Sequence, residues 1–159
     1  MSTRSLTFVK DDTNRVVMNM YRQCDGYPSG LGTELYEFLK DIKMVNGLGA
    51  NFDKKIANGA GCLAAQIVAH FKDGPGGVYL HSPSSKDCWQ EYEYHITADI
   101  SGITVKVIET GGGGKRGKTL YQGNLGGFGA FCKKGRLTCN ATKTMRTRRN
   151  VNDASTRKK

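Results

Sequence analysis

The stretch QEYEYHITADISGITVKVIE, residues 90–109, decides the fold. Apolar side chains occupy every second position on both sides of a short polar connection, 99–102. The apolar face comprises Tyr92, Tyr94, Ile96, Ala98, Ile103, Val105 and Val107, and the polar face begins with Glu91, Glu93, His95 and Thr97. Alternation with a period of two indicates half-buried strands, and the short connection favours a hairpin. This stretch therefore predicts two antiparallel strands with one face in a core.

The same period of two appears on both sides of the hairpin. Residues 5–9 and 16–22 alternate around a polar, turn-rich segment, and they predict an N-terminal hairpin. We expect Leu6 and Phe8 to share one face of the first strand. Val16, Met18 and Met20 share one face of the second. Residues 77–81 and 118–122 predict two further strands.

Helical periodicity appears in three other segments. Residues 31–43 carry an apolar stripe, and residues 58–72 are apolar nearly all round, which predicts a central, buried helix. A short helix over 125–133 is weakened by its glycines, and residues 44–56 look irregular. Together the segments predict an α+β fold, with a mostly antiparallel sheet packed on two main helices.

Charge divides the chain into two parts. Residues 1–132 hold 14 Lys and Arg against 13 Asp and Glu, whereas residues 133–159 hold ten Lys and Arg and one acid, Asp153. The end of the chain also has too little apolar surface to offset the entropy of ordering it. We therefore predict one α+β domain, 1–134, and a basic disordered tail, 135–159.

A polycationic tail suits polyanions, and RNA or DNA is the expected partner. Its cations are spaced by Thr, Asn and Ser without aromatic residues, which favours nonspecific phosphate contacts over stacking. The alternative is a solubilising terminus with no dedicated partner. The predicted nucleic-acid-binding residues are Lys143, Arg146, Arg148, Arg149, Arg157, Lys158 and Lys159.

The glycine-rich segment 111–119 contains GGGKRGKT, which satisfies the phosphate-binding P-loop pattern. A P-loop must open a helix, whereas the residues after 119 indicate a strand and then a turn. Two interpretations remain: a nucleotide-binding protein or enzyme that uses this loop, or a passive anion-binding loop. The loop's candidate residues are Lys115, Arg116, Lys118 and Thr119.

Other chemistry-bearing residues give weak signals. Zinc ligation by His81, Cys88, His95 and Cys24 lacks any standard ligand spacing. A further alternative is nucleophilic catalysis, with Cys24 as the nucleophile and His81 or His95 as the base. We predict no catalytic residue, no metal site and no cofactor. Among the aromatic residues, Tyr92 and Tyr94 should be core, and Trp89 and Tyr27 should be exposed.

The five cysteines are odd in number and form no Cys-x-x-Cys pair. No signal peptide is evident, and no apolar run approaches the length of a membrane span. Reduced thiols in a cytoplasm are the simplest interpretation, with no membrane partner.

Four segments carry a family resemblance: YRQCDGYPSGLG (21–32), VNG (45–47), ANGAGCLAAQ (57–66) and GVYL (77–80). Together they resemble a family of small bacteriophage and prophage proteins that share a Tyr-x-x-x-Asp-Gly-Tyr-Pro loop after an N-terminal hairpin. The resemblance covers most of residues 3–133 and excludes the tail. That family has no established activity, so the resemblance implies a viral context and a host-cytoplasm setting.

Relatives place His-Trp before the Asp-Gly and a His near the end of the loop, where this chain has Gln23, Cys24 and Leu31. This departure speaks against histidine-based catalysis or metal binding by the loop. The constant part of the pattern remains a candidate functional loop, although its Asp and Gly also suit a turn. Its residues are Asp25, Gly26, Tyr27 and Pro28.

The sequence thus predicts a non-enzymatic accessory protein of phage type. We expect its tail to bind nucleic acid and its core to bind a host or viral protein. The alternatives are a small nucleotide-binding protein or enzyme that uses the 111–119 loop, and an inhibitor of a host enzyme or defence system.

Overall fold

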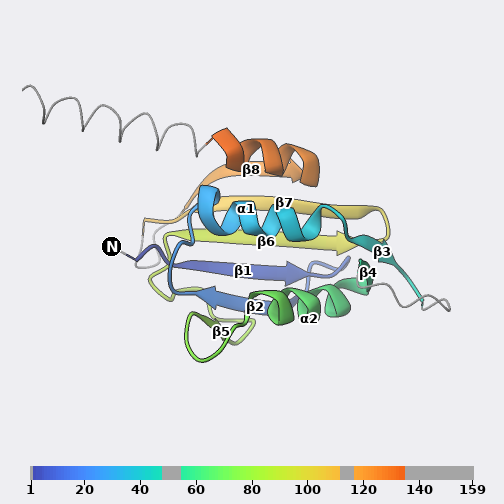
Figure 1. Ribbon diagram of the computed structural model, residues 1–159, viewed down its shortest axis with the longest axis horizontal. Helices are drawn as coiled ribbons and strands as arrows, with labels where there is room; N and C mark the ends of the chain where they lie inside the picture. The colour runs from blue at the N-terminus through green and yellow to red at the C-terminus, as the bar shows by residue number, and fades with distance from the viewer. Residues whose placement is uncertain (1, 48–54, 112–116, 135–159) are drawn as a thin grey trace, which may run out of the picture.

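The computed structural model describes residues 2–47, 55–111 and 117–134 (Figure 1). In this part of the chain a six-stranded sheet has the order β5-β2-β1-β6-β7-β8. Its strands are β1 (Ser5–Lys10), β2 (Val16–Arg22), β5 (Val78–Leu80), β6 (Tyr92–Asp99), β7 (Gly102–Glu109) and β8 (Lys118–Asn124). Only β1 and β6 pair in parallel, and the other neighbours are antiparallel. The mostly antiparallel α+β fold is confirmed.

Three helices cover one face of the sheet. They are α1 (Thr33–Leu39), preceded by the π-helical turn η1 (Pro28–Gly32), then α2 (Gly59–Phe71), and a last helix at residues 125–134. Figure 1 shows α1 in front of β6 and β7, and α2 in front of β2. The predicted apolar face of β6 and β7 packs here, with Tyr94, Ile96 and Val107 fully buried. The core therefore lies between the sheet and these helices.

Helix α2 is a covering helix rather than the central one that its composition predicted. Ala60, Leu63, Ala64 and Ile67 are buried, whereas Ala65 on the opposite side is exposed. Small apolar side chains expose little area, so they are tolerated on a solvent face that the composition alone reads as buried. Two short parallel strands, β3 (Lys43–Val45) and β4 (Ile56–Asn58), overlap the two ends of the 44–56 segment that was predicted to be irregular.

The predicted N-terminal hairpin forms as β1 and β2, but an irregularity in their pairing changes which β2 side chains face the core. The register shifts between Val9 and Lys10, so that Lys10 lies opposite Val16. Met18 and Met20 enter the helix-side core, and Val17 rather than Val16 packs against it. A bulge of this kind adds one residue to a strand and so breaks strict alternation.

The second face of the sheet is covered only over β1 and β2. Because β5 lies at the sheet edge and β6 lies beside β1, the connection 81–91 must cross these two strands. It crosses on the face opposite the helices, where the Asn19 amide donates to the carbonyls of Ser82 and Ser85 at 3.0 and 2.9 Å. Leu6 and Phe8 consequently share a buried face away from the helices. The part of this face over β6, β7 and β8 remains open.

Among the described residues, no helix combines the length and the apolar character that crossing a bilayer requires.

Candidate nucleic-acid interface

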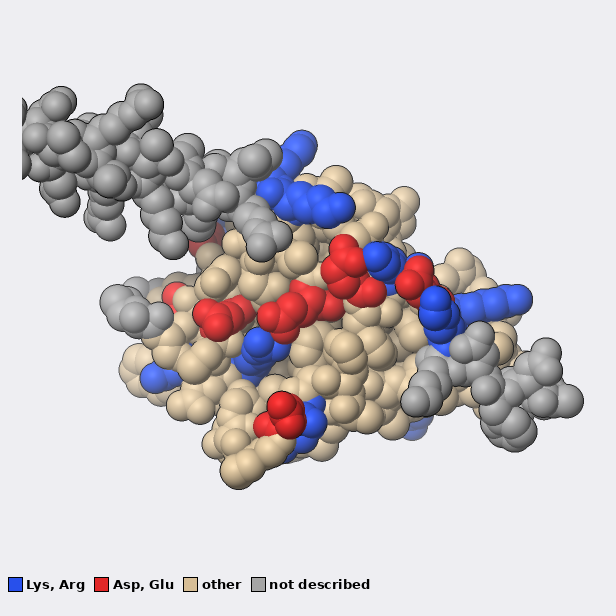
Figure 2. Space-filling view, viewed as in Figure 1, with Lys and Arg blue, Asp and Glu red and all other residues tan. Residues whose placement is uncertain are grey.

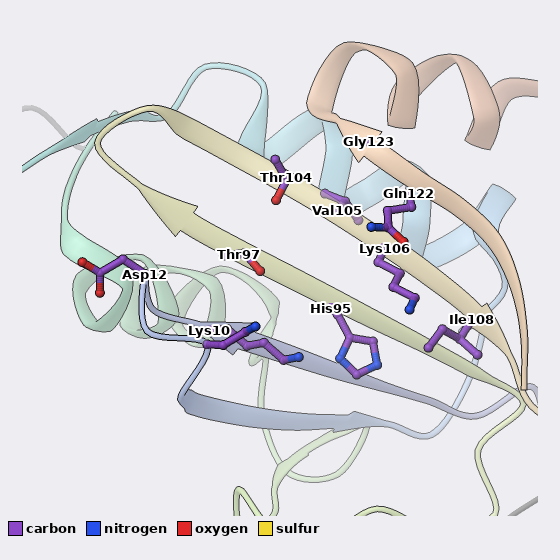
Figure 3. Close-up of a pocket in the computed structure, with 11 residues that line it drawn as sticks. Lys10, Asp12, His95, Thr97, Thr104, Val105, Lys106, Ile108, Gln122 and Gly123 are labelled. Carbon is purple, nitrogen blue, oxygen red and sulfur yellow. The ribbon is translucent and has the colours of Figure 1, made fainter. Parts of the chain in front are cut away.

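The open part of the sheet carries two rows of neighbouring side chains. The strand registers place one row across Phe8, His95, Lys106 and Gln122, and the next across Lys10, Thr97, Thr104 and Asn124. Side chains in such rows stand on one face, with about 4.8 Å between neighbouring strands. Except for Phe8 and Asn124, these residues line a groove of about 530 Å³, together with Asn14 from the β1–β2 turn (Figure 3). Its polar lining consists mainly of hydrogen-bond donors, including two lysine ammonium groups, and Asp12, Val105 and Ile108 also line it.

The turn that presents Asn14 is held by one carboxylate. Asp11 accepts hydrogen bonds from the backbone N–H groups of Thr13 and Arg15 at 3.1 and 2.9 Å, and from the Thr13 hydroxyl at 2.7 Å. Asn14 itself adopts a left-handed conformation, with φ 67°, which asparagine tolerates better than most residues. The turn therefore fixes one end of the groove.

Glu93 stands on the same face, beside the groove, and its carboxylate is held by hydrogen bonds. His95 Nε2 lies 2.9 Å from one of its carboxylate oxygens, and the buried Gln90 amide donates to the other at 2.8 Å. Burial raises the pKa of Glu93, but the hydrogen bonds from His95 and Gln90 and the charge of Lys10 outweigh it. The pKa of Glu93 is therefore below its ordinary value, and the carboxylate is ionised at neutral pH.

His95 is held in place rather than presented to a ligand through a nitrogen. Its ring stacks on Phe8 with 4.8 Å between centroids, Nε2 faces Glu93, and Nδ1 is buried. A general base needs a nitrogen within hydrogen-bonding reach of its substrate. This arrangement favours binding over proton transfer in the groove.

The candidate functional loop, Asp25 to Pro28, uses its backbone to join elements of the fold. The Gly26 carbonyl accepts from the Tyr94 hydroxyl at 2.9 Å, and the Gly26 N–H donates to the Thr3 carbonyl. The Asp25 carbonyl accepts from Leu31 N–H at 2.9 Å, and Pro28 begins η1. Tyr27 is exposed. These contacts account for the Asp-Gly pair as a turn and leave Tyr27 facing solvent.

Only part of the glycine-rich segment lies within the described residues. Lys118 and Thr119 open strand β8, where they pair with Glu109 and Ile108. A P-loop needs a helix at this point. Lys115 and Arg116 lie outside the described residues. The start of β8 and the end of β2 lie at the same end of the sheet. Ser5 pairs with both Arg22 and Tyr92, Tyr92 pairs with Glu109, and Glu109 pairs with Lys118.

All seven predicted tail residues, from Lys143 to Lys159, lie outside the described residues. The last described helix ends beside α1. Gly129 packs against the Tyr36 ring, and Lys133 Nζ lies 5.8 Å from the centroid of the same ring. The basic segment thus begins on the helix side of the molecule.

The cysteine and histidine residues do not gather as the zinc or Cys24 alternatives require. His81 Nδ1 lies 3.1 Å from Cys88 Sγ, whereas Cys24 contacts Ser2 and His95 contacts Glu93. Burial and the charge of Asp87 raise the pKa of the Cys88 thiol, which disfavours the nucleophilic thiolate. Within the described ranges no three His, Cys, Asp or Glu side chains form a group able to hold a metal.

The predictions of which aromatic side chains are buried and which are exposed are both confirmed. Tyr94 is fully buried, and Tyr92 packs partly buried against the core. Trp89 and Tyr27 are exposed, by 69% and 37% respectively. The two exposed rings are therefore available for contacts with a partner.

The two faces of the molecule differ in charge. Figure 2 shows a row of acidic side chains across the helix face, and α1 and the residues after it contribute Glu34, Glu37 and Asp41, all exposed. On the opposite face, the groove is lined by Lys10 and Lys106. Each of these three acids forms an ion pair, with Arg22, Lys40 and Lys55 respectively, so the helix face carries charges of both signs. The groove holds Lys10 and Lys106, with Asp12 at its edge, and these ammonium groups suit a polyanion.

Sequence reasoning did not single out the groove, although its signal is present in residues 90–109. The polar face of that stretch contributes Glu93, His95, Thr97, Thr104 and Lys106. Lys10, Asn14 and Gln122 join them only through nonlocal strand pairing.

We find no match of this chain to protein-family models, to curated proteins or to solved structures.

Proposed function

We propose that this chain is a non-enzymatic accessory protein of phage type that binds RNA or DNA without sequence preference through its basic tail. The observation that carries the proposal is the charge division, with ten Lys and Arg and one acid in residues 133–159 beside a nearly neutral domain. Cations that neutralise phosphates release condensed counterions, which drives binding without reading bases.

The surface of the domain supports the same proposal. Lys10 and Lys106 place two ammonium groups in the groove of the open sheet face, where they favour nucleic acid. The tail supplies attraction over distance.

The test replaces the seven tail cations from Lys143 to Lys159 with glutamine in the full-length chain. Seven phosphate contacts give a slope of log affinity against log salt of about −6 for a duplex, so affinity falls by roughly 4 × 10³-fold between about 50 and 200 mM salt. We expect the glutamine variant to lose most of this dependence, measured by fluorescence anisotropy with a labelled duplex. Unchanged affinity and slope would remove the tail from the binding site.

A protein partner for the domain is favoured by a separate observation. Tyr79 and Leu80 on edge strand β5 are exposed by 47% and 62%, and Trp89 by 69%. Large exposed apolar side chains of this kind are typical of protein-binding surfaces. The test is a pull-down from nuclease-treated host lysate, in which a Leu80→Ser, Trp89→Ser variant should lose a protein that the wild type and an Ile100→Ser control both retain.

A further inference from the structure

The groove over β6, β7 and β8 has the size and the chemistry of a small-ligand site. Its volume of about 530 Å³ lies in the range of ligand pockets. Thr97 and Thr104 lie opposite each other on β6 and β7, Lys10 pairs with Thr97 from β1, and Lys106 lies two residues from Thr104 on β7. The hydroxyls are neutral hydrogen-bond donors and the ammonium groups are cationic ones, and an oxyanion is a ligand that suits both.

The two lysines converge from opposite sides. Lys106 is the direct cross-strand neighbour of His95, and Lys10 is the neighbour of Thr97, two residues further along β6. Their Cα atoms are therefore roughly 12 Å apart, because two strand spacings separate them across the sheet and two residues separate them along the strands. The extended side chains of Lys10 and Lys106, one from each strand, together span this distance. Figure 3 shows His95 between the two side chains.

Two acids near the groove offset part of this positive charge, since Glu93 feels the charge of Lys10 and Asp12 is among the lining residues. Glu93 is paired with His95 and held by Gln90. Asp12 is the acidic side chain among the lining residues, and Figure 3 places it at one end, away from Lys106. The centre of the groove thus keeps two ammonium groups.

We propose that this groove binds a nucleotide, with one phosphate group held between Lys10 and Lys106 and the Thr97 and Thr104 hydroxyls beneath it. The Gln122 and Asn14 amides at the sides supply hydrogen bonds to a base or a ribose. This inference deepens the proposed function. It rests on that function where the nucleotide belongs to a strand, because the tail is proposed to bring the strand to the domain.

The test uses the full-length chain and two probes, uridine 5′-monophosphate and tetrauridylate. We expect both to shift the amide resonances of Thr97, Thr104, Lys106 and Gln122 in nitrogen-15 correlation spectra. A Lys10→Gln, Lys106→Gln variant should bind the monophosphate about tenfold more weakly by calorimetry. Lys40→Gln, which removes a lysine from the helix face, should bind like the wild type.

Tetrauridylate that binds more tightly than the monophosphate identifies a strand as the source of the nucleotide, and equal affinity identifies free nucleotide. Shifts confined to α1, or equal affinity of the double variant and Lys40→Gln, would overturn the groove as a site. The tail variant with seven glutamines separates the two proposals. It should keep the monophosphate shifts while losing the salt-dependent binding of a long duplex.

Discussion

At the scale of single residues, Gly26 shows how close packing fixes the loop after β2. A Cβ at this position would lie 2.6 Å from Ser5 Oγ and 2.9 Å from the Arg4 carbonyl carbon. Backbone atoms cannot move aside cheaply, so we expect Gly26→Ala to lower the free energy of unfolding by about 1–3 kcal/mol. The measurement is urea denaturation followed by circular dichroism.

Gly61 provides the matched control. It lies in α2, and a Cβ there would meet nothing within 4 Å. Gly61→Ala should raise stability by about 0.5–1 kcal/mol, because glycine is unfavourable in a helix. Equal effects of the two substitutions would show that the Gly26 contact does not stabilise the fold.

Glu93 gives a pH prediction whose sign follows from its environment. Its pKa in the folded state is lowered from the ordinary value of 4.5. A lowered folded pKa contributes stability that is present above pH 4.5 and lost as the pH falls through the folded value. We therefore expect the wild type to lose unfolding free energy in this acid window more steeply than Glu93→Gln, in urea titrations at several pH values. Glu91→Gln, an exposed neighbour, is the control and should follow the wild type.

At the scale of elements, the connection 81–91 acts as the cover of the second sheet face. Asn19 is 1% exposed, and its amide makes the two hydrogen bonds to Ser82 and Ser85. Asn19→Ala leaves both carbonyls without this donor, and it should cost about 1–3 kcal/mol. Hydrogen exchange should quicken at the amide of Ser85. Ser84→Ala, in the same connection, should leave the exchange unchanged, and an equal effect would refute the role of Asn19.

The strands and helices follow the sequence wherever the signal is local. Period-two alternation predicted β1, β2, β6 and β7, and it is cleanest in β6 and β7, which present one apolar set to the core, whereas β1 is buried on both faces. Three features depend on distant segments and carry no local signal. These features are the parallel pairing of β1 with β6, the bulge at Val9 and Lys10, and the burial of Leu6 and Phe8 beneath the 81–91 connection.

The candidate site likewise combines residues that local alternation assigns to one face with residues that only distant strand pairing brings there. The polar face of β6 and β7 is readable from alternation, so His95 and Lys106 could be assigned to one side of a strand. Lys10 reaches that side only because β1 pairs with β6. The pairing of Glu93 with His95 and Gln90 was likewise outside the reach of composition or periodicity.

At the scale of the whole molecule, the proposed nucleic-acid binding should depend on which face of the domain a strand meets. The exposed acids of α1, which form ion pairs with Arg22 and Lys40, lie on the helix side of the sheet (Figure 2), and Lys10 and Lys106 line the groove on its other side (Figure 3). If the tail attracts a strand as proposed, we expect that strand to favour the open sheet face, where Lys10 and Lys106 stand. Salt weakens this preference, because exposed charges are screened within about 10 Å at 0.1 M.

Lysine footprinting measures this direction without any substitution. Acetylation of the full-length chain at low salt, with and without oligouridylate, reports on each lysine separately by mass spectrometry. We expect the strand to protect Lys10 and Lys106 several-fold, because a phosphate-bound ammonium is both covered and held in its unreactive charged form. Lys40, paired with Glu37 on α1, should react at the same rate in both samples. Protection of Lys40 with free reaction of Lys10 and Lys106 would place the strand on the helix face and reverse the assignment of the two sides.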